Sequence, residues 1–384
     1  MITRRDILKS MFPRIFLKRA FLAFNSIKRN TWDHIFYQAE SISYDQFLIH
    51  KEFNPFLSNL VDTSRYDTFI KSKLAIWENP KWTQDQYILI YKKPGYIEPK
   101  VGWGVSFNRK LIYPSLGFAS APHVHRPRFT EFYFKRNITK LNSIISLRDT
   151  GEENYFHFYN DVLAKLFFLK EKGVSIQDYT IVISIKLYQK QYFQYFLNNT
   201  FLGDLSWHIQ GAHEWVNFKE AIFCKPFTHT KSFLNKAVDL VKQKSKLNTE
   251  KRLFLTRSTS SLRYVENLSE IEILLRKHKF QLVDTSQISL DLQIELFGNC
   301  RHLIAIHGAG ITNIIFRMGQ PLSILELVHP SPYIPFHYIL MAKLYGYDYD
   351  VMMGEKGQES RKGGFKIDVT HFEMKILHLL KDSL

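Results

Sequence analysis

The chain has 384 residues, which is enough for two domains of ordinary size, each with its own core. Hydrophobic residues make up 45% and charged residues 23%, a balance that excludes an intrinsically disordered chain. The formal charge of +16 predicts anionic partners, but no nucleic-acid-binding motif is present, so we expect no nucleic acid among them. Neither Cys224 nor Cys300 belongs to a CxxC pair, so we expect no structural zinc site and no disulfide framework.

Residues 1–30 combine basic side chains with apolar ones at helical spacing, such as Leu8, Phe12 and Phe16. This pattern is typical of a basic amphipathic helix on an anionic membrane surface, although Pro13 would interrupt it. A helix docked on the protein's own body would show the same pattern, and both alternatives stay open. No stretch reaches the ~18 consecutive apolar residues of a membrane-spanning helix. The absence of a secretion signal predicts a cytoplasmic protein, peripheral on the inner face of the cytoplasmic membrane if residues 1–30 attach there.

The next part of the chain divides near residue 140. Residues 31–140 mix short apolar runs with Pro/Gly turns and predict short strands and loops. Strand–helix alternation follows, the signature of a parallel sheet flanked by helices. We expect strands at 143–147, 180–185, near 207 and at 221–223, and helices at 153–170, 187–198 and 233–246. Residues 244–251 are polar without an apolar period and predict an interdomain linker.

The last third of the chain has the clearest alternation. We expect strands at 252–256, 281–284, 302–306 and 323–328, with helices at 267–278, 290–297 and 307–316. Four strands with helices between them predict a Rossmann-like domain. The fold class is therefore α/β, with two Rossmann-like domains facing each other across a cleft.

A glycine-rich turn, His307-Gly-Ala-Gly-Ile-Thr-Asn313, opens a helix directly after the buried strand 302–306. Glycines allow close approach of a ligand, and the free N–H groups of a helix start favour phosphate. A tight turn needing glycine only for packing is the alternative, because the spacing is not the full dinucleotide fingerprint.

Charged residues flank that turn. Arg257 and Arg263 follow the strand 252–256, where the loops of an open parallel sheet form the ligand crevice, and two guanidiniums there could clamp a diphosphate. A solvated basic loop is the alternative. Glu326 lies inside an apolar strand, where a carboxylate needs a partner, either ligand hydroxyls or an arginine in the core.

His157 and Asp161 are four residues apart on the helix expected at 153–170, so they share one face and can touch. An aspartate that orients a histidine makes a competent general base. A surface pair that stabilises the helix is the alternative, and Glu152 and Glu153 are substitute candidates for the base.

Together, Arg252-Leu-Phe-Leu-Thr-Arg257, Arg263, the His307–Asn313 turn and Leu325-Glu-Leu327 resemble the pattern of the family 61 glycosyltransferases. The upstream segment Asn154-Tyr-Phe-His-Phe-Tyr-Asn-Asp-Val-Leu163 is similar to the N-terminal-domain motif of that family. The resemblance covers roughly residues 142–330, and its motifs are specific through their order and spacing rather than one by one.

The resemblance implies a GT-B fold and an inverting sugar transfer from a nucleoside-diphosphate sugar to a hydroxyl of a glycan or glycolipid acceptor. It implies no cofactor and no metal, and for bacterial members a role in capsule, lipopolysaccharide or other surface glycans. We expect three segments: residues 1–30, an acceptor-side domain at 31–245, and a donor-binding domain at 246–384 whose last helix could return to the first domain. His157 and Asp161 are the candidates for the general base. In family terms, Glu326 would hold the ribose of the donor. The residues that would hold its phosphates are Arg257, Arg263, His307, Gly308, Ala309, Gly310, Thr312 and Asn313.

Other functions predict other features. A methyltransferase of Rossmann type would have a glycine-rich loop after the first strand of the domain, whereas this loop is basic and lacks glycine. A catalytically inactive nucleotide- or glycan-binding protein at a membrane surface remains the main alternative to an enzyme. His123 and His125 resemble a metal-binding pair, but the sequence places no third ligand near them.

Overall fold

The computed structural model describes residues 52–55, 66, 68–74, 83–117, 127, 132, 135, 137–241, 250–257, 263–332, 334–358 and 363–381. The amphipathic segment 1–30, the histidines at 123 and 125, and most of the predicted linker lie outside these residues. The described part is a mixed α/β structure with four sheets. Among its helices, none is both long and apolar enough to cross a lipid bilayer.

The C-terminal half is built on a parallel five-stranded sheet of order β14-β12-β15-β16-β17. Its strands are β12 (Lys251–Leu255), β14 (Gln281–Val283), β15 (Cys300–Ile306), β16 (Ser323–Val328) and β17 (Asp348–Met353). Helices α10 (Leu268–Lys277) and α13 (Val369–Leu379) cover one face. Helices α11 (Leu290–Gly298) and α12 (His337–Tyr345) and the 3-10 helix η7 (Ala309–Arg317) belong to the cluster on the other face. A small sheet of β13 (Tyr264–Val265), β19 (Gly364–Lys366) and β18 (Glu355–Lys356) lies at its edge.

The N-terminal half is built on a six-stranded sheet of order β1-β2-β11-β7-β8-β9. Its strands are β1 (Glu52–Pro55), β2 (Thr83–Tyr91), β7 (Ser143–Ser146), β8 (Thr180–Ser184), β9 (Trp207–Gln210) and β11 (Glu220–Lys225). Four of them, β11, β7, β8 and β9, pair in parallel. Strand β2 pairs antiparallel with β11, and β1 pairs antiparallel with β2. The strands predicted near 143, 180, 207 and 221 are therefore confirmed.

The two faces of this sheet are covered differently. Helical segments pack on one face: α5 (Tyr155–His157), the π-helix η4 (Phe158–Leu163), α6 (Ala164–Glu171), α7 (Ile185–Tyr188), α8 (Gln191–Asn199) and α9 (Lys231–Val241). A second sheet packs on the other face: β5 (Leu111–Ile112), β4 (Gly104–Ser106), β3 (Gly95–Ile97), β10 (Glu214–Phe218) and β6 (Asn137–Lys140). Short 3-10 turns are η3 (Tyr113–Ser115), η5 (Ile176–Asp178) and η6 (Phe201–Asp204). Four of its strands, β3, β4, β5 and β6, come from the part of the chain up to residue 140, where the sequence predicted short strands.

Two expected helices differ in detail from the prediction. The helix expected at 153–170 contains a π-helical turn, η4, whose six residues are all buried. The helix expected after the glycine-rich turn is a 3-10 helix. Both irregular segments lie where the two halves meet. Helix α5 contacts η7, the Tyr159 ring of η4 lies 6.2 Å from the Phe316 ring of η7, and all three segments share one continuous apolar cluster. The interface between the halves is thus packed as a core.

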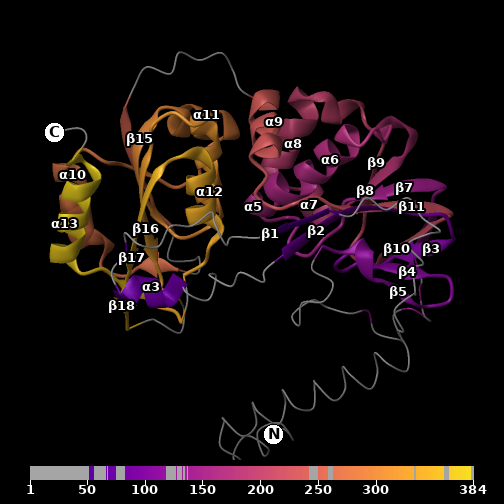
Figure 1. Cartoon of the computed structure of the whole chain (residues 1–384), viewed down its shortest axis with the longest axis horizontal. Coiled ribbons are helices and arrows are strands. Elements are labelled where there is room, and N and C mark those ends of the chain that lie inside the picture. The colour runs from indigo at the N-terminus through magenta and orange to yellow at the C-terminus, as the bar shows by residue number, and fades with distance from the viewer. Residues whose placement is uncertain are drawn as a thin grey trace, which may run out of the picture.

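Segments distant in sequence join the halves. The short helix α3 (Thr68–Leu74) lies beside the C-terminal half (Figure 1), where Lys73 accepts a hydrogen bond from the Ile334 amide. The Tyr66 hydroxyl likewise donates to the carbonyl of Tyr349 on β17. The last helix does not return to the N-terminal half, because α13 buries its apolar face against α10. It is α12 that contacts the N-terminal half, where Tyr345 Oη donates to Asn235 Oδ1 at 2.8 Å.

Candidate functional site

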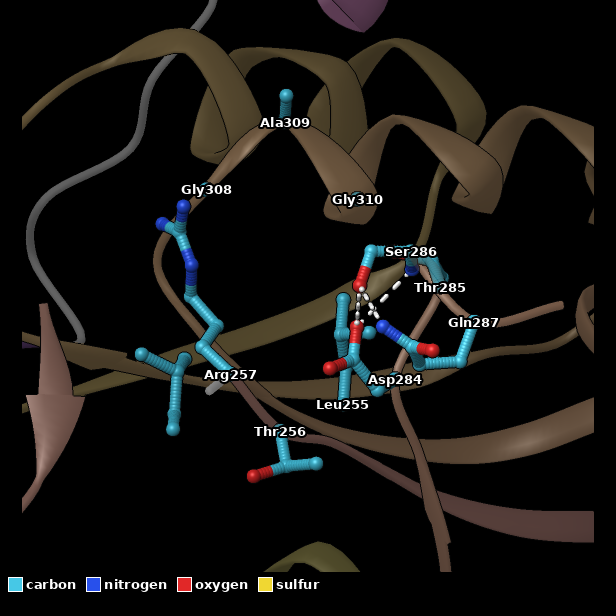
Figure 2. A pocket seen from close by; sticks show the side chains of 11 residues that line it. Leu255, Thr256, Arg257, Asp284, Thr285, Ser286, Gln287, Gly308, Ala309 and Gly310 are labelled. Carbon is cyan, nitrogen blue, oxygen red and sulfur yellow. Dashed lines mark hydrogen bonds between the residues drawn. The ribbon is translucent and has the colours of Figure 1, made fainter. Parts of the chain in front are cut away.

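A pocket of about 260 Å³ opens at the carboxyl ends of β14, β12 and β15. In the order β14-β12-β15, the second strand of the chain lies on one side of the first and the third on the other, so the connections diverge there. Open α/β sheets bind ligands in the crevice at such a reversal of strand order. Figure 2 shows the lining residues, which are Leu255, Thr256, Arg257, Asp284, Thr285, Ser286, Gln287, Ile306, Gly308, Ala309 and Gly310.

Arg257 forms one side of the pocket and rises toward the glycine-rich turn (Figure 2). Its Nη1 donates to the carbonyl oxygen of His307 at 2.8 Å. Burial and the nearby charge of Arg263 lower the pKa of this guanidinium. Within the described residues it forms no ion pair with a carboxylate. A half-buried cation without a neutralising partner is suited to an anionic ligand.

The glycines of the turn are required by close approach. A Cβ on Gly308 would lie 2.3 Å from Arg257 Nη1, and one on Gly310 would lie 2.8 Å from Thr285 Oγ1. The 3-10 helix η7 starts at Ala309, and the first amides of a helix have no partner within it. The turn therefore places backbone donors beside the guanidinium, as an anion site requires.

Arg263 lies beyond the stretch 258–262, which is outside the described residues, and does not line the pocket. Its φ of 67° puts a non-glycine residue in the left-handed region, a conformation that is uncommon and costly. Its charge acts on Arg257 and on Tyr338. The structure thus brings the two predicted arginines near each other, but only Arg257 reaches the pocket wall.

His307 and Glu326 form a buried pair. The His307 Nδ1 is hydrogen-bonded to Glu326 Oε1, and the Tyr349 hydroxyl donates to Glu326 Oε2. The side chain of Glu326 is 0% exposed and that of His307 is 10% exposed. The partners of the buried Glu326 carboxylate are thus a histidine and a tyrosine, whereas the sequence analysis considered an arginine or the hydroxyls of a ligand. Both carboxylate oxygens are occupied, and the ribose-binding role of Glu326 stays a prediction.

Thr312 and Asn313 are 0% exposed, inside η7. Asn313 Nδ2 donates to Gln293 Oε1 at 2.9 Å, and the Tyr155 hydroxyl donates to Asn313 Oδ1 at 2.6 Å. Because Tyr155 belongs to the N-terminal half, Asn313 joins α5 to η7. Neither residue lines the pocket, so their contribution in this structure is to position the turn.

His157 and Asp161 are in contact at the junction of α5 and η4. The His157 Nδ1 lies 2.5 Å from Asp161 Oδ2. Since an ionised carboxylate can only accept, Nδ1 carries the proton and Nε2 is left for another partner. Asn160 Nδ2 donates to Asp161 Oδ1 at 2.9 Å and holds the carboxylate from the other side. The His157 side chain is 29% exposed, so the imidazole is partly open to solvent.

Each member of the pair alters the pKa of the other. Burial favours the neutral form of His157, but the hydrogen bond and charge of Asp161, with further charges from Asp149 and Glu153, outweigh it and raise its pKa. Burial likewise opposes ionisation of Asp161, but His157 and Lys165 outweigh it and lower the pKa of Asp161. The pair therefore holds a strengthened base beside a carboxylate that is ionised at neutral pH.

The two histidine–carboxylate pairs approach each other around α12. His337, at its start, stacks on His229 with ring centroids 5.4 Å apart. Burial, and then the charge of His157 among others, lower the pKa of His337 to about 4, and His307 contributes to the same shift. Phe156 lies 6.0 Å from the Tyr338 ring, and Tyr338 lies 5.5 Å from the His307 ring. His157 on one half and His307 on the other are thus neighbours of the same α12 residues.

Several residues considered in the sequence have other surroundings. Glu152 is 2% exposed and its Oε1 accepts from Arg148 Nε at 2.8 Å, so it is sealed in the core. Glu153 accepts a hydrogen bond at its carbonyl from the Tyr192 hydroxyl. Cys224 and Cys300 are free and buried. Among the described residues, no three or more histidine, cysteine, aspartate or glutamate side chains are grouped to hold a metal ion.

Sequence reasoning missed the pocket wall formed by residues 284–287 and the α12 residues His337 and Tyr338. The sequence does place Asp284 at the end of an expected strand, which is a signal for a crevice residue. Which loops meet at one edge depends on the spatial order of the strands. That order, with β12 between β14 and β15, is set by tertiary packing and is not written in the local pattern.

The structure thus defines an α/β protein with an anion-suited crevice in one half and a histidine–aspartate pair in the other. Residues 155–325 match the family model described as Glycosyltransferase 61. The match confirms, over these residues, the resemblance to the family 61 glycosyltransferases that the sequence predicted. It begins at Tyr155, includes His157, Arg257 and His307, and ends one residue before Glu326. A comparison with curated proteins gave no match.

Proposed function

We propose that the protein transfers a sugar from a nucleoside-diphosphate sugar to a hydroxyl of a glycan or glycolipid acceptor. One observation carries the proposal. An anion-suited pocket lies in one half, lined by a glycine-rich helix start and by Arg257, which forms no ion pair with a carboxylate within the described residues. A partly exposed histidine–aspartate pair lies in the other half, and both His157 and His307 are close to residues of α12. Transfer requires these two elements, one to hold the departing diphosphate and one to take the acceptor proton.

The reaction follows from these positions. His157 Nε2 takes the proton of the acceptor hydroxyl while that oxygen forms a bond to the anomeric carbon. The bond from this carbon to the diphosphate oxygen breaks, and its electron pair leaves with the diphosphate. Arg257, Arg263 and the amides at the start of η7 stabilise the charge that grows on the diphosphate. Asp161 keeps His157 in the correct tautomer and stabilises the imidazolium that forms.

The finer assignments belong to the same proposal. A base and a leaving group on opposite sides of the anomeric carbon give inversion, in a GT-B arrangement with the acceptor side at 31–245 and the donor side at 246–384. We propose that transfer needs no metal or other cofactor, because the guanidiniums and helix amides supply the positive charge. We also propose a cytoplasmic protein that makes surface polysaccharide or glycoconjugate, attached to the inner face of the membrane through residues 1–30.

The test is thermal stabilisation of the full chain by a panel of nucleoside diphosphates and sugar nucleotides, with and without EDTA. We expect at least one ligand to raise the melting temperature in EDTA, and Arg257→Ala to reduce the shift at the same ligand concentration. Arg276→Ala is the matched control, because Arg276 is on the far helix α10 with its side chain 77% exposed. If the folded protein responds to no ligand in the panel, the donor-binding function is wrong.

Catalysis needs a separate measurement, because an inactive binding protein would give the same shifts. With the stabilising sugar nucleotide, slow release of the nucleoside diphosphate into water is the expected residual activity of an intact transferase site. Binding without any release, at enzyme concentrations comparable to those of the donor, would favour the catalytically inactive alternative. Release that depends on added divalent cation would overturn the metal-free part of the proposal.

A further inference from the structure

The pocket contains one feature that phosphate binding does not use. Of the described residues that line it, Asp284 is the one carboxylate. It follows β14, and Figure 2 shows it with Ser286 on the side of the pocket opposite Arg257. A carboxylate repels phosphate, so its presence in an anion-suited pocket requires a different group of the ligand at that end.

The Asp284 side chain is held in a fixed orientation. Its Oδ1 accepts from the Ser286 amide at 2.9 Å and from the Ser286 hydroxyl at 2.7 Å. Its Oδ2 has no hydrogen-bond partner within the described residues. The charge of Asp284 acts on Arg257, but the two side chains form no ion pair. The pocket therefore presents an ordered carboxylate oxygen at one end and a guanidinium at the other.

A carboxylate oxygen accepts hydrogen bonds, and hydroxyl groups are donors that it can bind although they carry no charge. The carboxylate to which the sequence pointed, Glu326, has both oxygens bonded to His307 and Tyr349 and is 0% exposed. Asp284 is half-buried and borders the pocket. In dinucleotide-binding sheets of this kind, an acidic residue beyond the first strand–helix turn binds ribose hydroxyls while the turn holds phosphate. The positions of Asp284 and of the Arg257–Gly308 wall match that division of labour.

We propose that Asp284, rather than Glu326, binds the hydroxyl groups of a sugar ring of the donor, with the adjoining phosphate held at Arg257 and the start of η7. The proposal rests on the donor-binding function proposed above and deepens it. The ring is either the ribose of the nucleotide or the transferred sugar, since both carry neighbouring hydroxyls next to a phosphate. The pocket volume of about 260 Å³ is below the ~300–1,000 Å³ of pockets that enclose whole drug-sized ligands, which fits one ring and its phosphate.

The test compares Asp284→Asn with the unaltered full chain, by calorimetric or thermal-shift titration in EDTA. The probes are inorganic pyrophosphate, UDP, 2′-deoxy-UDP and UDP-glucose, with the corresponding guanosine set where the panel favours it. Loss of a charged hydrogen bond weakens, by about tenfold or more, the binding of the probe that carries the bound ring, which is UDP for the ribose or UDP-glucose for the transferred sugar. Pyrophosphate binding stays equal or strengthens, because a repelling charge is removed. Weaker binding of the ring-bearing probe without weaker pyrophosphate binding is the signature of the proposal.

Two further variants sharpen the result. Ser286→Ala removes one of the two donors that orient Asp284, so we expect a smaller loss of affinity, in the same direction, for the ring-bearing probe. Glu295→Gln makes the same carboxylate-to-amide change on α11, at a side chain that is 54% exposed, and leaves every probe unchanged. Asparagine keeps the size of the aspartate, and a melting temperature without ligand verifies that each variant folds.

The possible outcomes distinguish the ribose from the transferred sugar, and they distinguish a failure of this proposal from a failure of the donor-binding function. If 2′-deoxy-UDP binds weakly and Asp284→Asn does not weaken it further, the ring is the ribose. If UDP and 2′-deoxy-UDP bind alike and the variant weakens UDP-glucose alone, the ring is the transferred sugar. If the variant weakens nucleotides and pyrophosphate equally, or leaves all affinities unchanged, Asp284 does not bind hydroxyls and the proposal is wrong while donor binding stands. If no probe in either set binds to the folded protein, the donor site itself is misplaced.

Discussion

Two histidine–carboxylate pairs near α12, one in each half, differ in how far they are buried. His157 and Asp161 have side chains 29% and 12% exposed, whereas His307 and Glu326 are 10% and 0% exposed. In the first pair the second carboxylate oxygen accepts from an amide of Asn160, and in the second from the Tyr349 hydroxyl. A histidine must exchange its proton with substrate to act as a base, and only the first pair is open enough for that. The second pair is suited to holding the glycine-rich turn in place.

The largest effect is expected from removing the proposed base. His157→Ala removes Nε2, and general base catalysis contributes about 10²–10⁴-fold to a rate. We therefore expect kcat to fall by about that factor, with the donor-induced melting shift unchanged, since His157 does not line the pocket. Initial rates of diphosphate release with saturating donor and acceptor give the measurement.

His213→Ala is the matched control for this variant. His213 lies in the exposed turn between β9 and β10, and its removal leaves kcat unchanged. A His157→Ala enzyme with more than a tenth of the normal rate would show that another residue takes the proton. The comparison between the two pairs would then need His307 as the next candidate.

The buried pair should instead respond in stability. Glu326→Gln disrupts the hydrogen bonds of Glu326 with His307 and Tyr349 in a site without solvent, and leaving a buried polar group unsatisfied costs about 1–3 kcal/mol for each group. Asp161→Asn keeps an acceptor in a more open site and should cost about 1 kcal/mol of unfolding free energy. Denaturant unfolding of both variants measures the difference. Equal losses would contradict the distinction drawn from burial.

How far the sequence predicts this site depends on the range of the interactions. The pairing of His157 with Asp161 follows from helical spacing, and the glycine-rich turn follows from its position after a strand, so local pattern was sufficient for both. The π-helical turn after His157 was not predicted, because the apolar face of residues 156–167 is compatible with an ordinary helix. The two-sheet construction of the N-terminal half was equally hidden, since β10 and β3 are far apart in the chain.

Glu326 shows the limit most clearly. The sequence indicates that a carboxylate in an apolar strand needs a partner, and the structure confirms that it has one. The identity of that partner depends on the pairing of β16 with β17, which brings Tyr349 alongside, and on the turn that brings His307 back over the strand. Asp284 was overlooked for the same reason, because its neighbour across the pocket follows a different strand. Contacts between segments that are distant in the sequence therefore decide whether Glu326 or Asp284 is available to a ligand.

A smaller effect, on affinity rather than turnover, is expected at the pocket wall. Arg257→Ala removes a charged donor to the diphosphate, and a hydrogen bond to a charged group contributes about 1.5–3 kcal/mol. We expect the donor Kd to rise by about ten- to a hundredfold. Arg257→Lys should recover only part of this, because an ammonium cannot reproduce the contact of Nη1 with the His307 carbonyl while also facing a ligand. A full recovery with lysine would show that charge alone is needed.

The smallest effect is a shift in pH dependence that separates the two pairs. His157 acts as a base only when it is deprotonated, and Asp161 helps to raise its pKa above the ordinary 6.5, so kcat should rise with pH through a value above 6.5. Asp161→Asn removes the hydrogen bond and charge that raise this pKa, leaving burial to lower it, so the acid limb should move to lower pH while the plateau falls. Because the folded-state pKa of His157 is raised, its contribution to folding stability is present at low pH and is lost as the pH rises through that pKa. Because the folded-state pKa of Asp161 is lowered, its contribution to folding stability is lost as the pH falls through that pKa. Glu326→Gln should leave the acid limb in place. A limb that moves with Glu326→Gln and stays with Asp161→Asn would assign proton transfer to the buried pair and reverse the roles proposed for the two halves.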